Sequence, residues 1–130
     1  MRRGESPPEE KILRTYRAAA VMATIGIAVK LTTTAGYEGY VSIAGDGERA
    51  IGILETAAVA VGDEVRVCVH GFTMAVANHD FAINDLLNSG ASTGKLDTAA
   101  TTEQAIAVAE QAATAQNDKV AVFVHSQYAV

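Results

Sequence analysis

From Gly26 onward, hydrophobic and polar residues alternate along the chain in short runs that predict β-strands. The alternation is clearest at residues 27–32, 40–43 and 65–70, because successive side chains of a strand point to opposite faces of a sheet. Glycine, asparagine and aspartate pairs typical of turns separate these runs. Many short strands at this spacing predict an all-β domain, either a small barrel-like fold or a sandwich, over residues 26–130.

The predicted β domain contains an internal repeat. Residues 51–70 align without gaps onto residues 106–125, with half of the positions identical, including the histidine that closes each copy. Two copies are too few for a solenoid, so they predict a pseudo-symmetric pair of strand–turn–strand units. The repeat also predicts a strand at residues 106–110, although the surrounding stretch 102–115 has a composition compatible with a helix.

Residues 1–25 are predicted to form an N-terminal arm. Two conformations remain open for it: an extended arm, or a short helix over about residues 7–19, since Ser6-Pro7-Pro8-Glu9 resembles a helix capping box. A signal peptide with residues 18–29 as its apolar core is disfavoured, because a long segment with three glutamates precedes that core. The apolar stretch is also too short to span a bilayer, and we expect no membrane association.

Charge divides unevenly between the arm and the body. Residues 1–17 hold five of the ten Lys and Arg residues but three of the fifteen Asp and Glu residues, so their net charge is +2 and that of the remaining chain is −7. The acidic body argues against direct nucleic-acid binding, which needs a basic face. An aromatic content of 5% without tryptophan argues against stacking of bases or sugars. The arm and the body are therefore expected to face different neighbours.

The hydrophobic residues are mostly small. Hydrophobic residues make up 49% of the chain, but alanine is the commonest of them, followed by valine. Because burial contributes about 25 cal/mol per Å² of apolar surface, alanine adds little to a core. This composition suggests that the domain gains stability by burying further surface between subunits of a homo-oligomer.

The residues that could carry chemistry do not form a recognisable site. His70 and His125 occupy equivalent repeat positions, but no further metal ligand stands beside them at a suitable spacing, so we expect both at a surface or interface. His79-Asp80 is interpreted as a turn, and Cys68 beside His70 does not by itself make a nucleophilic dyad. The single cysteine excludes an intramolecular disulfide and a cysteine-rich zinc site. We predict no catalytic residue, no metal site and no cofactor.

A series of short motifs follows a characteristic order along residues 26–125. In chain order they are Ile51–Leu54, Gly62-Asp63, Val65–Gly71, Ala75–Ala77, Ile83–Leu87, Thr93-Gly94-Lys95, Ile106–Glu110 and Asp118–Val124. This order resembles the capsid cement (head decoration) proteins of tailed bacteriophages. The sequence departs from the family pattern at Ala107 and at Asn84, where glycine is usual. Residues 1–25 lie outside the resemblance.

The resemblance implies a trimeric, non-enzymatic structural protein of the virion, made in the host cytoplasm, that binds the major capsid protein on the outer capsid surface and stabilises the shell. We further hypothesise that residues 1–25 grip the capsid or exchange between subunits. The candidate contact residues are Arg2, Arg3, Arg14, Tyr16 and Arg17. The alternatives are a secreted or surface β module for adhesion and, less favoured, a small trimeric β-fold hydrolase, which would need converging polar motifs that the sequence lacks.

Overall fold

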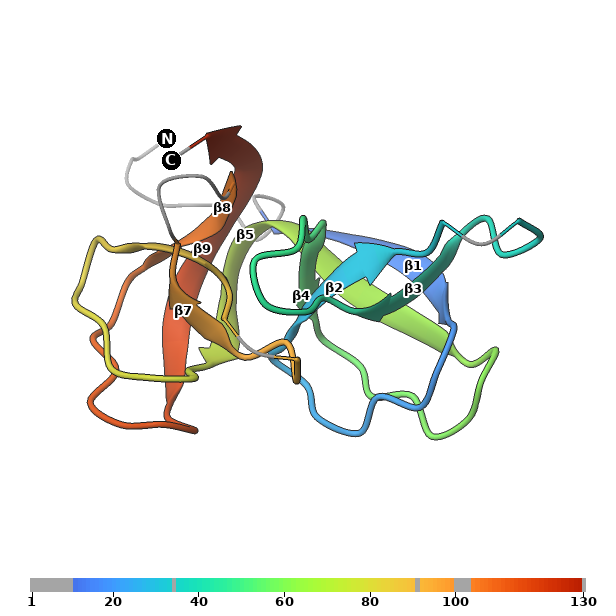
Figure 1. Ribbon diagram of the computed structural model, residues 1–130, viewed down its shortest axis with the longest axis horizontal. Coiled ribbons are helices and arrows are strands. Elements are labelled where there is room, and N and C mark those ends of the chain that lie inside the picture. The colour runs from blue at the N-terminus through green and yellow to red at the C-terminus, as the bar shows by residue number, and fades with distance from the viewer. Residues whose placement is uncertain (1–10, 34, 91, 100–103, 130) are drawn as a thin grey trace, which may run out of the picture.

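The computed structural model describes residues 11–33, 35–90, 92–99 and 104–129. Within these ranges the chain forms strands and turns but no helix (Figure 1). The described residues therefore contain no helix that could cross a membrane. The prediction of an all-β domain is confirmed. The nine strands are β1 (Ile12–Ala18), β2 (Ala28–Leu31), β3 (Tyr40–Ile43), β4 (Gly52–Leu54), β5 (Glu64–Val76), β6 (Leu86–Ser89), β7 (Leu96–Thr98), β8 (Gln104–Ala109) and β9 (Lys119–Ala129).

Strands β1 to β5 form a closed barrel, which we call the first barrel. Its strand order is β1-β3-β2-β4-β5, and β1 closes it by pairing antiparallel with the N-terminal half of β5. β1 also runs parallel to β3, so that Ala18 lies opposite Val41. Closure leaves no unpaired sheet edge between these strands. The interior is filled by buried side chains that include Met22, Val29 and Leu54.

The C-terminal half of β5 continues into a second barrel, with strand order β5-β9-β8-β6-β7. A parallel bridge between Ala77 and Leu96 brings the start of β7 back to the end of β5. Figure 1 shows the two barrels side by side, with β5 running from one into the other. The strand predicted at residues 106–110 from the repeat is confirmed by β8.

The two barrels are structural repeats of each other over all five strands, whereas the sequence repeat covers two. The parallel pairing of Ala18 with Val41 in the first barrel corresponds to that of Ala77 with Leu96 in the second. Strand pairs β2–β3 and β2–β4 correspond to β6–β7 and β6–β8, all antiparallel. The chain is therefore a duplicated barrel in which one long strand, β5, is shared.

Residues 12–18 belong to the first barrel and do not extend from it as an arm. The sequence placed them in the N-terminal arm and left a helix and an extended conformation open; the structure gives an extended strand, β1, paired along its length with β5. The pairing with β5, about fifty residues away in sequence, supplies backbone hydrogen bonds that an isolated arm would lack. The capping-box segment Ser6–Glu9 lies outside the described residues.

Polar contacts fix the two barrels against each other. Ser89 Oγ donates to the backbone oxygen of Ala44 at 2.7 Å, and the backbone nitrogen of Gly47 donates to the backbone oxygen of Ser89 at 2.9 Å. On the same side of the junction, the backbone nitrogen of Ala28 donates to the oxygen of Gly94 at 2.8 Å. These bonds join β6 and the following turn of the second barrel to the β2 and β3 region of the first.

An aspartate closes the turn before the last strand of each barrel. In the first barrel, Asp63 Oδ2 accepts hydrogen bonds from the backbone nitrogens of Val59 and Ala60, both at 3.0 Å. In the second barrel, Asp118 Oδ2 accepts from the backbone nitrogen of Thr114 at 2.9 Å and from its hydroxyl at 3.0 Å. These bonds favour the charged carboxylate and lower the pKa of Asp118.

The substitution Asp118→Asn is expected to lower the free energy of unfolding at neutral pH. The depressed pKa means that the charged carboxylate contributes stability above its ordinary pKa of 3.8, and that this contribution is lost as the pH falls through the folded-state pKa. The difference between wild type and variant should therefore shrink in acid. Urea unfolding at neutral and acidic pH measures it, with Asp46→Asn in another exposed turn as the charge-matched control. A difference that is the same at both pH values would contradict this role.

Candidate functional site

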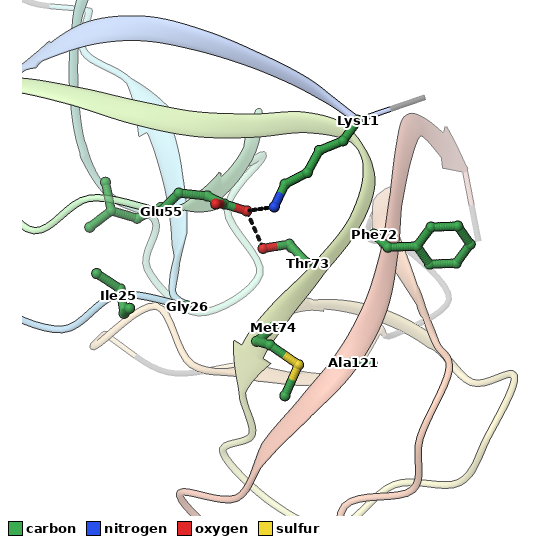
Figure 2. A pocket seen from close by; sticks show the side chains of 9 residues that line it. Lys11, Ile25, Gly26, Glu55, Phe72, Thr73, Met74 and Ala121 are labelled. Carbon is green, nitrogen blue, oxygen red and sulfur yellow. Dashed lines mark hydrogen bonds and ion pairs between the residues drawn. The ribbon is translucent and has the colours of Figure 1, made fainter. Parts of the chain in front are cut away.

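A depression of about 440 Å³ lies where the two barrels meet (Figure 2). Its lining comes from five separate parts of the chain: Lys11 before β1, residues 25–26 before β2, residues 54–55 at the end of β4, the C-terminal half of β5, and Ala121 on β9. None of these segments forms the depression alone, because it exists only where β5 passes from one barrel to the other.

Gly26 allows the chain to pass between the barrels beside this depression. It adopts a left-handed φ of 86°, which glycine tolerates at little cost. Its nitrogen donates to the oxygen of Leu54 at 2.8 Å, and its oxygen accepts from the nitrogen of Val76 at 2.9 Å. A β-carbon here would lie 3.3 Å from the oxygen of Met74. The tight passage leaves Ile25 exposed at the rim of the depression.

A small polar network crosses one side of the depression. Glu55 Oε2 forms an ion pair with Lys11 Nζ at 2.8 Å and also accepts a hydrogen bond from Thr73 Oγ1, as the dashed lines in Figure 2 show. The Glu55 side chain is 20% exposed. Because Lys11 and Glu55 are the charged residues of the lining, their pairing leaves the depression without net charge.

The rest of the rim is apolar and exposed. Ile25, Phe72 and Met74 are 46%, 47% and 51% exposed, and Phe72 packs against Phe123 of the neighbouring strand with ring centroids 5.0 Å apart. In Figure 2 the Phe72 ring points away from the Lys11–Glu55 pair, so the exposed apolar side chains beside the depression are Ile25 and Met74. Adjacent exposed apolar side chains are typical of protein interaction surfaces. The arrangement can receive apolar side chains of a partner protein.

The histidines lie in two separate places. His70 on β5 and His125 on β9 both lie near the Phe123 ring, with ring centroid distances of 5.3 Å and 6.4 Å. His79 instead pairs with Asp97 at 2.7 Å, and this hydrogen bond raises the pKa of the His79 imidazole. Across the part of the chain that the structure describes, no group of three or more His, Cys, Asp or Glu residues is placed to hold a metal ion.

Cys68 lies on β5, and its side chain is fully buried in the core. Burial is the main cause that raises the pKa of its thiol, and the negative charge of Glu55 adds to this. The thiol donates weakly to the backbone oxygen of His70 at 3.5 Å. Cys68 is therefore a protonated, inaccessible side chain of the core.

The five contact residues predicted from sequence fall into two groups. Arg2 and Arg3 lie outside the described residues, whereas Arg14, Tyr16 and Arg17 lie on β1. Arg14 is exposed, but Tyr16 is half-buried and packs against the core of the first barrel. Tyr16 therefore has a structural role, and its assignment as a contact residue remains a prediction.

Arg17 is engaged within the barrel. Its Nη1 donates to the backbone oxygen of Gly62 at 3.0 Å, and its Nη2 lies 3.9 Å from Glu64 Oε2. The guanidinium thereby ties β1 to the turn before β5. These contacts of Arg17 could not be predicted from the sequence. The depression could not be predicted either, because its lining residues form no local sequence motif.

Comparison with known proteins identifies the fold. No known protein family matches the chain, and no curated protein matches its sequence. A solved structure with a similar fold is the N base of the head fiber gp8.5 of bacteriophage phi29, with a TM-score of 0.60 and 19% sequence identity over 88% of this chain and 93% of that chain. At this identity the similarity establishes the fold.

Proposed function

We propose that this chain is a non-enzymatic structural protein of a tailed-phage head, which binds the outside of the capsid as a trimer and stabilises the shell. The observation that carries the proposal is the fold similarity to the phi29 head fiber base, which covers nearly the whole of both chains. The order of short motifs that resembles capsid cement proteins supports the same assignment independently.

The surface proposed to contact the capsid combines residues 1–10, the part of the predicted arm that precedes β1, with the depression between the barrels. Lys11 lines the depression and directly follows residues 1–10 in sequence. Arg2 and Arg3 give residues 1–10 positive charge, and Arg14 is exposed on β1, while Ile25 and Met74 supply exposed apolar contact at the depression. An apolar centre with charged residues around it is the usual composition of a protein interface.

Co-sedimentation with capsids tests this proposal. The full chain is mixed with capsids assembled from the major capsid protein of the same genome, and the pellet is analysed for bound protein. We expect the wild-type chain to co-sediment and to raise the temperature at which the capsids disrupt. We expect the double variant Arg2→Ala, Arg3→Ala to bind at least tenfold more weakly, since positive charges at an interface rim steer association.

The matched control removes two positive charges from the second barrel, with Lys95→Ala and Lys119→Ala together. This variant has the same net charge as the arm variant, so equal weakening of both would show a non-specific effect of charge and contradict the role of the arm. Absence of wild-type protein from the capsid pellet would reject capsid binding itself. Binding without a rise in disruption temperature would reject shell stabilisation.

A further inference from the structure

Each barrel has a seam at which two strands run parallel. In the first barrel the seam joins β1 to β3, and the backbone nitrogen of Ala19 donates to the oxygen of Val41 at 2.8 Å. In the second barrel it joins the end of β5 to β7, and the nitrogen of Asn78 donates to the oxygen of Leu96 at 2.7 Å. The duplication places Asn78 at the position of Ala19, so the two seams can be compared residue by residue.

The backbone holds the second seam less completely than the first. The first seam has a further direct bond, in which the nitrogen of Arg17 donates to the oxygen of Gly39 at 3.0 Å. At the position equivalent to Arg17, the nitrogen of Val76 donates instead to the oxygen of Gly26, in the first barrel, at 2.9 Å. The second seam therefore depends more on the contacts at its other end.

Side chains connect the two strands at that other end. Asp97 Oδ2, on β7, lies 2.7 Å from His79 Nδ1 and 3.5 Å from Asn78 Nδ2, which also donates to the backbone oxygen of Gly90 at 3.3 Å. Asn78 is buried. A β-carbon on Gly90 would overlap that of Asp97, so the glycine leaves room for the aspartate. We call Asn78, His79 and Asp97 the seam clamp.

The first barrel closes its seam with residues that cannot form such a clamp. The three equivalent positions hold Ala19, Ala20 and Ser42. The methyl groups of the two alanines cannot bridge the strands by hydrogen bonds or by charge. Because the first seam forms without these contacts, the architecture does not require them, and the seam clamp is a property of the second barrel alone.

Two carboxylates face His79. Asp97 approaches it from β7, and Asp80 follows it in the same turn. Lys95, the basic residue two positions before Asp97, donates to Asn117 Oδ1 at 2.6 Å. The hydrogen bond to Asp97 and the negative charges of Asp97 and Asp80 raise the pKa of the His79 imidazole.

We propose that the seam clamp is a proton-dependent device, which tightens the second barrel when His79 is charged and loosens it when His79 is neutral. The charged ring and Asp97 form an ion pair across the seam, whereas a neutral ring keeps only a hydrogen bond. A histidine with a raised pKa contributes stability that is fully present below its ordinary pKa of 6.5 and is lost as the pH rises through the folded-state pKa. This inference does not rest on the proposed function.

Amide hydrogen exchange of the full chain, followed residue by residue by NMR, tests the seam clamp. The Asn78 amide donates across the second seam and the Ala19 amide across the first, so one experiment contains its own comparison. After correction for the intrinsic pH dependence of exchange, protection of the Asn78 amide should fall about two- to fivefold between about pH 6 and about pH 8, the range expected for an exposed ion pair. Protection of the Ala19 amide should stay the same.

Asp97→Asn removes the charge and keeps the shape of the side chain. The pKa of His79, followed by NMR titration, should move toward its ordinary value of 6.5, and the pH dependence at Asn78 should disappear. Asp80→Asn is the matched control, because it removes the same charge from a carboxylate that acts on His79 through charge alone; it should lower the pKa less and keep most of the pH dependence.

His79→Ala provides a second route to the same answer. The His79 side chain is 65% exposed, so its removal should leave the fold intact, and the pH dependence at Asn78 should again disappear. Two outcomes would overturn the inference. One is a pKa of His79 that is the same in the wild type and in Asp97→Asn. The other is an equal change of corrected protection at Asn78 and Ala19, since the second seam would then have no proton-dependent opening of its own.

Discussion

A chain that starts at residue 19 is expected to lose the fold of the first barrel, whereas a chain that starts at residue 11 is expected to keep it. The difference between them is β1. This strand pairs with β3 on one side and with β5 on the other, so its removal opens the barrel and leaves two unpaired strand edges. It also removes Ala18, which is fully buried, and Tyr16, which packs on the core.

Circular dichroism and urea unfolding distinguish the two truncations. The chain from residue 11 should show the wild-type spectrum and a single cooperative transition. The chain from residue 19 should lose strand signal and become sensitive to protease in its N-terminal half. If both truncations unfolded with the same midpoint as the full chain, β1 would contribute nothing and residues 12–18 would belong to a separate arm after all.

This result also decides how the arm must be tested. The hypothesis drawn from sequence treated residues 1–25 as one capsid-gripping element, but a deletion of that length removes β1 as well. Loss of capsid binding would then report an unfolded barrel as readily as a missing contact. A deletion that ends at residue 10 leaves every described strand in place, and it is therefore the deletion that addresses capsid binding.

Local signals in the sequence predicted much of the fold. Alternation identified the strands around residues 27–32, 40–43 and 65–70, because a strand with one buried face repeats every two residues. The sequence repeat predicted two related units and the strand at residues 106–110. Each of these features depends on neighbours close in the chain, or on two segments that resemble each other.

Features that depend on distant partners could not be predicted in the same way. β1 is largely exposed and has little apolar periodicity, so its strand identity comes from its pairing with β5. In the middle of β5 the alternation of apolar and polar residues predicts the wrong buried face. The apolar Phe72 and Met74 are about half exposed, while the polar Thr73 between them is partly buried. Thr73 points into the depression between the barrels, where its hydroxyl donates a hydrogen bond to Glu55.

The substitution Gly52→Ala is expected to lower the free energy of unfolding by about 2–3 kcal/mol, as is typical of overpacking at a rigid site. Gly52 lies on β4, against the backbone of β5. A β-carbon at this position would lie 2.3 Å from the backbone oxygen of Cys68 and 2.8 Å from a methyl group of Val67. The obstructing atom is strand backbone, which cannot move aside without disturbing the pairing of Ile53 with Cys68.

The second barrel provides the matched control, because the equivalent position holds Ala107, which is fully buried. Ala107→Gly removes a methyl group where alanine is accommodated, so it should cost only about 1 kcal/mol, through chain entropy. Urea unfolding at one pH compares the two variants. The duplication thus separates steric from entropic effects. Similar losses of unfolding free energy in both variants would show that the approach of β5 does not require glycine at residue 52. A larger loss at residue 52 would show that β5 lies too close to this position for any side chain.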